Sequence, residues 1–314
     1  MFIVSTFVEG SIKMFKQLPK FSKILVTSLI VIIAVFATLL LVLNIYMIGY
    51  RKDNAATRAT LVKNNSELIG TRFEVPRDGK DNVKVNLYIP EHEDNEKLPV
   101  IFNIHGGGFV GGDADLLDTQ SDRISKEWHS IIVTINYTKA DVKPIEYGVE
   151  EIKDTILYFR DHANEYHADP TKFSVLGYSA GGYYAASSAI ELDKAGFKLA
   201  SQILCYTWSK FLPEDQVNPT VAPALFVLAS EDPISQDSRV YEETLRNSGI
   251  KTEIKEYQGA KHSFIESNNP EGYKTGTKEE LAEYITPEQE KLAREAESGI
   301  NSWLQELYKK ITNR

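Results

Sequence analysis

The chain has 314 residues, of which 42% are hydrophobic and 25% charged, proportions typical of a globular protein that exclude wholesale disorder or a fibrous repeat. A single cysteine excludes a disulfide framework and any cysteine-based zinc or iron–sulfur site. The formal net charge is −9, and because basic residues gather in residues 1–63, the rest of the chain is more acidic still. This charge argues against nucleic acid as a partner, because nucleic-acid binding depends on neutralising phosphates.

The first predicted element is a membrane-spanning helix over residues 24–48, which contain no charged side chain. As a helix this run reaches roughly 37 Å, enough to cross a hydrocarbon core of ~30 Å with some tilt. A cleaved signal peptide is the main alternative, but its apolar region is usually about 7–15 residues long and ends in a small-residue cleavage pattern that this run lacks. We therefore expect an uncleaved single-pass anchor in the cell membrane, between a short basic segment over 1–23 and a stalk over 49–70.

The orientation of this anchor is only weakly indicated by charge, because Lys and Arg are equally frequent on its two sides. Long C-terminal domains also cross membranes largely regardless of their charge. We expect the remaining domain, residues 71–314, to lie outside the cytoplasm.

Residues 71–314 alternate short runs of β-branched residues with stretches of helical periodicity, which predicts one α/β domain with a mostly parallel sheet flanked by helices. The first predicted strand, 83–89, alternates polar and apolar residues as a half-exposed edge strand does, and the last, 252–257, alternates again. The strands between them are short and apolar, as strands buried on both faces are, and cover 100–104, 131–135, 173–176, 202–206 and 224–229. The predicted helices cover 150–166, 183–195 and 238–248, with Gly249 at a helix C-cap.

A closing amphipathic helix is predicted after Thr286, which offers an N-cap, with Pro287 at the first helical position and Gln289 as a capping-box residue. The polar stretch over 266–285 precedes this helix. Two interpretations of that stretch stay open, a plain surface loop and a flap over a functional site.

The sequence Gly177-Tyr178-Ser179-Ala180-Gly181 follows an apolar strand and precedes a helical pattern. In this context G-x-S-x-G predicts a sharp turn that presents Ser179 as a nucleophile, with glycines where a Cβ would clash with the neighbouring strand and helix. The amide of Ala180, the residue after the serine, becomes an oxyanion donor in such a turn. The alternative is a glycine-rich turn without chemistry.

A second glycine-rich loop, His105-Gly106-Gly107-Gly108, follows the buried strand over 100–104. Loops of this type supply backbone N–H groups to an oxyanion hole. A phosphate-binding loop is the alternative, but neither the P-loop Lys nor the G-x-G-x-x-G spacing is present. We expect His105 to brace this loop rather than to act as a base.

The base and the acid follow from chain order, because in this type of site the serine precedes the acid and the acid precedes the histidine. Only His262 comes after Ser179 in the chain. The acid belongs at the end of the strand over 224–229, where Asp232 is the first choice, ahead of Glu231 and Asp237. We expect Asp232 to orient the imidazole while His262 takes the proton from Ser179.

Together these segments resemble the α/β-hydrolase fold and, within it, the hormone-sensitive-lipase-like carboxylesterases. The resemblance covers about residues 83–265 and rests on the glycine loop, the serine turn and the loops that carry Asp232 and His262. It implies that the amides of Gly107, Gly108 and Ala180 form the oxyanion hole. The chain departs from many members in having Tyr178 where they have an aspartate before the serine. It also has no cap domain inserted after residue 206.

The sequence thus predicts a membrane-anchored serine hydrolase that cleaves carboxylic esters, with no metal or organic cofactor. Because little room remains for a cap, short acyl chains or small polar esters are the expected substrates. A peptidase or amidase using the same three residues is an alternative. A non-catalytic binding protein with a hydrolase fold is another, although such proteins usually lose one member of the triad.

Overall fold

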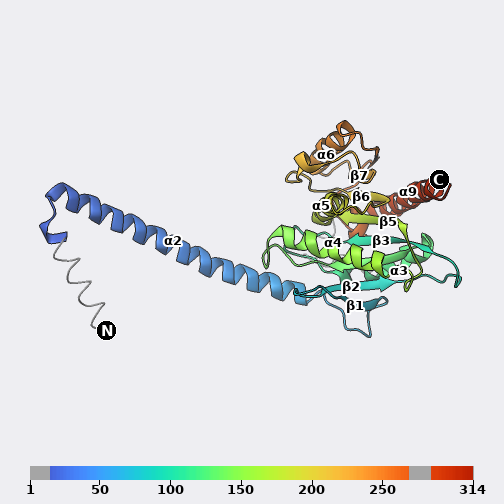
Figure 1. The fold of residues 1–314 in the computed structure, drawn as a ribbon, viewed down its shortest axis with the longest axis horizontal. Coiled ribbons are helices and arrows are strands. Elements are labelled where there is room, and N and C mark those ends of the chain that lie inside the picture. The colour runs from blue at the N-terminus through green and yellow to red at the C-terminus, as the bar shows by residue number, and fades with distance from the viewer. Residues whose placement is uncertain (1–14, 269–283, 314) are drawn as a thin grey trace. The chain divides into compact units, whose positions relative to one another are not determined.

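The computed structural model describes residues 15–268 and 284–313 and divides into two compact units, Met1–Ala55 and Ala56–Arg314. The first unit contains most of helix α2 (Lys20–Ala59; Figure 1). None of the residues of this helix is buried. Among the described residues it is the one helix long and apolar enough to cross a membrane, a test that a signal sequence near the N-terminus also passes. Residues 1–14 of the predicted basic segment lie outside the described residues.

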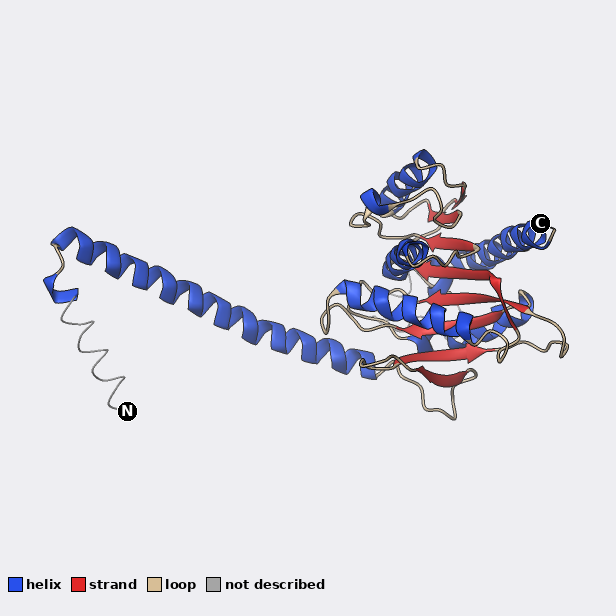
Figure 2. Cartoon of the chain, in the orientation of Figure 1, coloured by secondary structure: helices blue, strands red, loops and turns tan. Residues whose placement is uncertain are grey.

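The second unit is built around an eight-stranded sheet with helices on both faces (Figure 2). The strand order is β1-β2-β4-β3-β5-β6-β7-β8, in which β1 and β2 pair antiparallel with their neighbours and all the later pairs are parallel. The strands are β1 (Thr71–Val75), β2 (Val83–Tyr88), β3 (Leu98–Ile104), β4 (Ile131–Asn136), β5 (Ala168–Tyr178), β6 (Ser201–Cys205), β7 (Ala224–Ala229) and β8 (Thr252–Tyr257). The predicted fold class is confirmed.

The helices of this unit are α3 (Asp118–Glu127), α4 (Ile145–Asp161), α5 (Ala180–Lys194), α6 (Ser235–Asn247), α7 (Phe264–Ser267) and α9 (Pro287–Thr312). Short 3₁₀ turns cover Ala114–Leu117 and Glu214–Gln216. Successive residues of β3 point to opposite faces of the sheet, so Phe102 packs in one core cluster and Ile101 in the other. Apolar residues of α4, α5 and α6 belong to the first cluster, and those of α3 and α9 belong to the second.

The prediction that residues 83–89 form an edge strand is wrong. Strand β1 pairs antiparallel with β2 and occupies the edge, so β2 is hydrogen-bonded on both sides. The alternation in β2 reflects a sheet face, not an edge, since Val83, Val85 and Tyr88 are buried while Lys84 is exposed. The short β1 was missed because its sequence, TRFEV, has too few apolar residues to show a pattern.

Two helices also differ from the predictions. Helix α4 begins at Ile145, directly after Pro144, and ends at Asp161, about one turn earlier at each end than expected. It includes Gly148, which lies where the ring of Tyr184 packs and where a Cβ would meet that ring at 2.8 Å. Helix α3 was not predicted, because the buried residues along it are mostly polar.

Candidate active site

The turn between β5 and α5 holds Ser179 in a strained backbone conformation, with φ 52° and ψ −116°. The flanking glycines are required by close packing. A Cβ on Gly177 would lie 2.3 Å from the carbonyl oxygen of Gly181, and one on Gly181 would lie 2.2 Å from that of Ile104. The serine amide donates to the Cys205 carbonyl at 3.0 Å, which ties the turn to β6. The serine therefore sits at the carboxyl end of the sheet, at the start of a helix.

Loops after β7 and β8 bring an acid and a histidine to this serine. The Ser179 Oγ and His262 Nε2 atoms are 2.9 Å apart, and His262 Nδ1 and Asp232 Oδ2 are 2.7 Å apart. Because a carboxylate only accepts hydrogen bonds, Nδ1 carries the proton in the neutral ring and Nε2 is free to accept from the serine hydroxyl. The structure thus places Ser179, His262 and Asp232 in one hydrogen-bonded chain, while Glu231 is exposed and Asp237 lies on α6.

The protonation of His262 depends on competing effects. Burial favours the neutral imidazole, but the hydrogen bond and charge of Asp232, with the charge of Glu266, outweigh it and raise the pKa of His262 above its usual value. The Asp232 side chain is 1% exposed and also accepts from the Ile234 amide at 3.0 Å, so its position is fixed. A carboxylate held in this way can stabilise the imidazolium that forms when the histidine accepts a proton.

The glycine loop after β3 has the backbone freedom that close approach to a ligand requires. Gly107 and Gly108 have φ values of 126° and 58°, and a Cβ on Gly107 would lie 2.4 Å from the Gly111 carbonyl oxygen. The Gly111 amide closes the loop by donating to the Gly107 carbonyl at 2.7 Å. This loop lies next to the serine turn, since a Cβ on Gly106 would meet Ser179 Cβ at 3.4 Å.

His105 braces the base of this loop. It is fully buried, stacks on Tyr137 with ring centroids 4.4 Å apart, and its Nδ1 lies 2.6 Å from the Gly106 carbonyl oxygen. Lys139 donates to its Nε2 at 3.1 Å, and burial and the Lys139 charge hold the pKa of His105 well below its ordinary value. Burial also lowers the pKa of Lys139 to about 7. A neutral, fully hydrogen-bonded His105 is a structural side chain, as its sequence position predicted.

Comparison with known proteins supports the interpretation of this geometry. Residues 101–221 match the profile of an α/β-hydrolase-fold family. Esterase LipI of Mycobacterium tuberculosis is 26% identical over 219 residues, which cover 56% of this chain and 68% of that protein. An acetyl esterase of Salmonella choleraesuis is 24% identical, over 59% of this chain and 70% of its own. An esterase of Pyrobaculum calidifontis superposes with a TM-score of 0.63 at 21% identity, covering 83% of this chain and 94% of its own.

Residues 101–221 therefore carry an α/β-hydrolase-fold domain, and the chain is similar to carboxylesterases. This esterase shares its fold with the Pyrobaculum protein, and its curated relatives identify it as a carboxylesterase-type hydrolase.

Sequence reasoning missed two residues that support the histidine of this esterase. Gln289 was expected to close a capping box, and the Thr286 side chain does accept from the Gln289 amide at 3.2 Å. The Gln289 side chain, however, accepts from the Lys261 amide at 3.0 Å and donates to the Gly259 carbonyl at 2.7 Å. The closing helix thereby holds the loop that carries His262. The other missed residue is Glu266, which follows His262 by four positions and is buried.

The stretch over 266–285, for which a surface loop and a flap were both open, lies mostly outside the described residues. Residues 266–268 belong to α7 and its end, residues 284 and 285 precede α9, and residues 269–283 lie outside the described residues.

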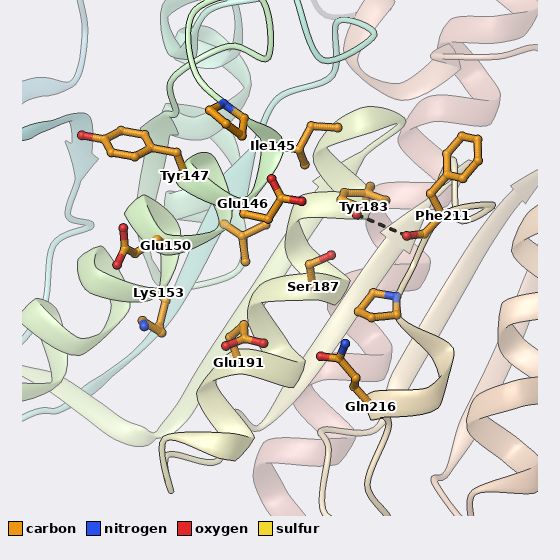
Figure 3. Close-up of a pocket in the computed structure, with 13 residues that line it drawn as sticks. Ile145, Glu146, Tyr147, Glu150, Lys153, Tyr183, Ser187, Glu191, Phe211 and Gln216 are labelled. Carbon is orange, nitrogen blue, oxygen red and sulfur yellow. Dashed lines mark hydrogen bonds between the residues drawn. The ribbon is translucent and has the colours of Figure 1, made fainter.

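A groove of about 700 Å³ lies beside the site, along the outer face of α5 (Figure 3). Neither Ser179 nor His262 lines it. Tyr183, four residues after the serine on α5, is at the near end, and its hydroxyl donates to the Phe211 carbonyl at 3.3 Å. Phe109 of the glycine loop contacts both Tyr183 and Trp208, with ring centroids 5.4 and 5.2 Å apart. An aromatic wall therefore links the groove to the loop beside the serine.

The segment that begins with the end of α2 is part of the hydrolase unit, although it was expected to be a stalk. Arg58 donates to the Val110 carbonyl at 2.5 Å and to the Asp141 carboxylate at 3.0 Å. The Lys63 amide and Arg72 donate to the Asp115 carboxylate at 2.8 and 2.6 Å. Val110 and Asp115 lie two and seven residues after the last glycine of that loop, Gly108. The segment thus fixes the far side of the loop that is predicted to hold the oxyanion.

Replacing Arg58 by methionine is expected to lower the free energy of unfolding by about 2–3 kcal/mol, because hydrogen bonds to charged groups contribute about that much when buried. The Asp141 side chain is 1% exposed and Arg58 15%, so water replaces the lost contacts poorly. Denaturant unfolding of the purified full chain measures the change. Arg239→Met is the matched control, because Arg239 pairs with Glu256 on the surface and should cost about 0.5 kcal/mol or less. Equal losses in the two variants would contradict the structural role of Arg58.

Proposed function

We propose that this esterase is a membrane-anchored serine hydrolase that cleaves short-chain or small polar carboxylic esters through Ser179, His262 and Asp232. The observation that carries the proposal is the hydrogen-bonded chain from the Asp232 carboxylate through His262 to Ser179 Oγ. It joins residues from three separate loops at the strained turn where a nucleophile is accessible.

In the proposed reaction, Ser179 Oγ attacks the ester carbonyl carbon while His262 Nε2 takes the hydroxyl proton. The amides of Gly107, Gly108 and Ala180 stabilise the tetrahedral oxyanion. His262 then gives its proton to the leaving alcohol, which leaves the acyl group on Ser179. Water activated by the same histidine releases the acid and restores the serine.

The substrate class follows from the surroundings of the serine. The chain passes from β6 to β7 over residues 206–223, too short a connection for an inserted cap domain. The aromatic side chains of Phe109, Tyr183 and Trp208 pack together beside the glycine loop, which suits a small acyl or alcohol group. The name of the Salmonella relative, an acetyl esterase, agrees with a short acyl group.

Anchoring is supported by the apolar run of α2, in which large hydrophobic side chains are exposed along the helix. An exposed apolar surface of this length requires burial, and a lipid bilayer of ~30 Å matches it. The hydrolase unit would then lie outside the cytoplasm.

The proposal is tested with the full chain, purified in detergent, on p-nitrophenyl esters from acetate to palmitate and with a fluorophosphonate probe. We expect hydrolysis that is fastest for acetate or butyrate, and labelling that is lost in Ser179→Ala. A preference for palmitate would overturn the short-chain assignment. Faster cleavage of an amide than of an ester with the same acyl group would favour the peptidase alternative. Absence of both hydrolysis and labelling in folded protein would overturn the serine mechanism.

A further inference from the structure

A second carboxyl group lies buried beside the histidine. The short helix α7 starts two residues after His262 and turns Glu266 into the interior, where it is 2% exposed. Tyr206 donates its hydroxyl to Glu266 Oε2. The ring of Tyr206 lies edge-on against the His262 imidazole, with centroids 5.3 Å apart. On the other side, Glu266 Oε1 lies 3.0 Å from where a Cβ on Gly106 would be. The carboxyl is thus packed between the histidine loop, β6 and the glycine loop.

The other buried glutamates of the unit have arginine partners. Glu297 pairs with Arg123 at 2.7 Å, and Arg77 lies 4.0 Å from Glu151. Within residues 15–268 and 284–313, no lysine or arginine forms an ion pair with Glu266. Burying a carboxylate without a paired cation costs free energy, so a nearby positive charge would stabilise Glu266 in its ionised form. The residue beside it that can become positive is His262.

The titratable groups that face Glu266 come from every element around it. Tyr178 of β5, Cys205 at the end of β6 and Tyr206 directly after it are uncharged in the neutral pH range, and His262 is the neighbour that takes up a positive charge. Burial raises the pKa of Glu266 to about 7, against the opposing effects of the Tyr206 hydrogen bond and the His262 charge. The carboxyl therefore ionises near neutral pH, beside a histidine whose pKa is raised.

We propose that Glu266 is a second carboxylate of the active site, a positioning residue that stabilises the His262 imidazolium together with Asp232. When Ser179 attacks, its proton passes to His262 Nε2, and the new positive charge forms next to the Glu266 anion. The serine–oxygen bond to the acyl carbon forms as the O–H bond breaks, and no proton moves to Glu266. The proposal rests on the proposed function, because it needs His262 as the base.

The test is the pH dependence of kcat/KM in the full chain, with Glu266→Gln as the first variant. We expect kcat/KM at the alkaline plateau to fall about tenfold. We also expect the acid limb, the rise of kcat/KM with pH on the acid side of the profile, to move to lower pH by about one unit. Both follow because one unit in the pKa of the imidazolium corresponds to a tenfold change in its protonation equilibrium. The acid limb should also lose steepness, since two coupled groups titrate in the wild type and one in the variant. Glu297→Gln is the matched control for loss of a buried carboxylate, and its acid limb should not move.

Tyr206→Phe is the second variant and keeps the carboxyl in place. Without the phenol donor Glu266 should ionise at higher pH, so the acid limb should move upward, opposite to the Gln variant, while the plateau above about pH 9 recovers most of the wild-type rate. An unmoved limb in either variant, or the same shift in Glu297→Gln, would overturn the role of Glu266. If the proposed function itself were wrong, the wild type would show neither hydrolysis nor fluorophosphonate labelling, which distinguishes the two failures.

Discussion

Replacing Ser179 by alanine is expected to lower kcat for a short ester by about 10⁴–10⁶-fold, because the nucleophile and the acyl-enzyme route are lost together. Substrate binding should change little, since the glycine loop is intact. Steady-state kinetics on p-nitrophenyl acetate measure the loss, and circular dichroism verifies the fold. The residual rate should lie near that of the oxyanion donors acting alone.

The double variant Ser179→Ala/His262→Ala makes this prediction sharper. The two side chains share one hydrogen bond of 2.9 Å and act on one proton, so removing both should cost no more than removing either. If the two losses multiplied instead, the residues would act independently and the proposed proton transfer would be contradicted.

Replacing Gly181 by alanine is expected to destabilise the hydrolase unit by more than about 3 kcal/mol, or to prevent folding. The new Cβ would lie 2.2 Å from the Ile104 carbonyl oxygen. This oxygen belongs to the backbone of a central strand, so it cannot move aside by a side-chain rotation. Denaturant unfolding of the purified chain gives the loss. Activity should fall in proportion, because the clash separates the serine turn from the glycine loop.

Gly196→Ala is the control for backbone strain alone. Gly196 has φ 78° and open space around a Cβ, so alanine there should cost about 1 kcal/mol. A loss at Gly181 no larger than the loss at Gly196 would mean that the serine turn tolerates the displacement, against the packing described above.

The sequence predicted most of the site because its parts are local patterns attached to strand ends. The turn at Ser179 and the loop at Gly107 each follow an apolar run, and parallel strands place their carboxyl ends at one edge of the sheet. Chain order then left His262 as the one histidine after the serine, and Asp232 at a strand end. Strands β7 and β8 were also predicted to the residue, since β7 is a short apolar run and β8 alternates polar and apolar residues.

The remaining supporting residues depend on contacts between distant segments, which a local pattern does not contain. Glu266 lies on a four-residue helix, whose exposed or buried face cannot be read from so short a run. Gln289 fits a capping box by sequence, but its side chain contacts Gly259 and Lys261, which lie about thirty residues away. Strand β1 gains its place only by pairing with β2.

The last helix reaches into the site at several points. Gln289 holds the loop of His262. Glu297 accepts a hydrogen bond from the side-chain amide of Gln120, which also donates to the Tyr178 hydroxyl. The Tyr308 hydroxyl forms a hydrogen bond of 2.9 Å with Ser174 of β5, the strand that leads to Ser179. During translation, Ser179, Asp232 and His262 are therefore all synthesised by position 262, before the residues of α9 that contact their loops. A nascent chain that stops before α9 carries the serine, the acid and the histidine but lacks the contacts of Gln289, Glu297 and Tyr308. Synthesis order thus places the contacts of α9 after all three residues of the proposed triad.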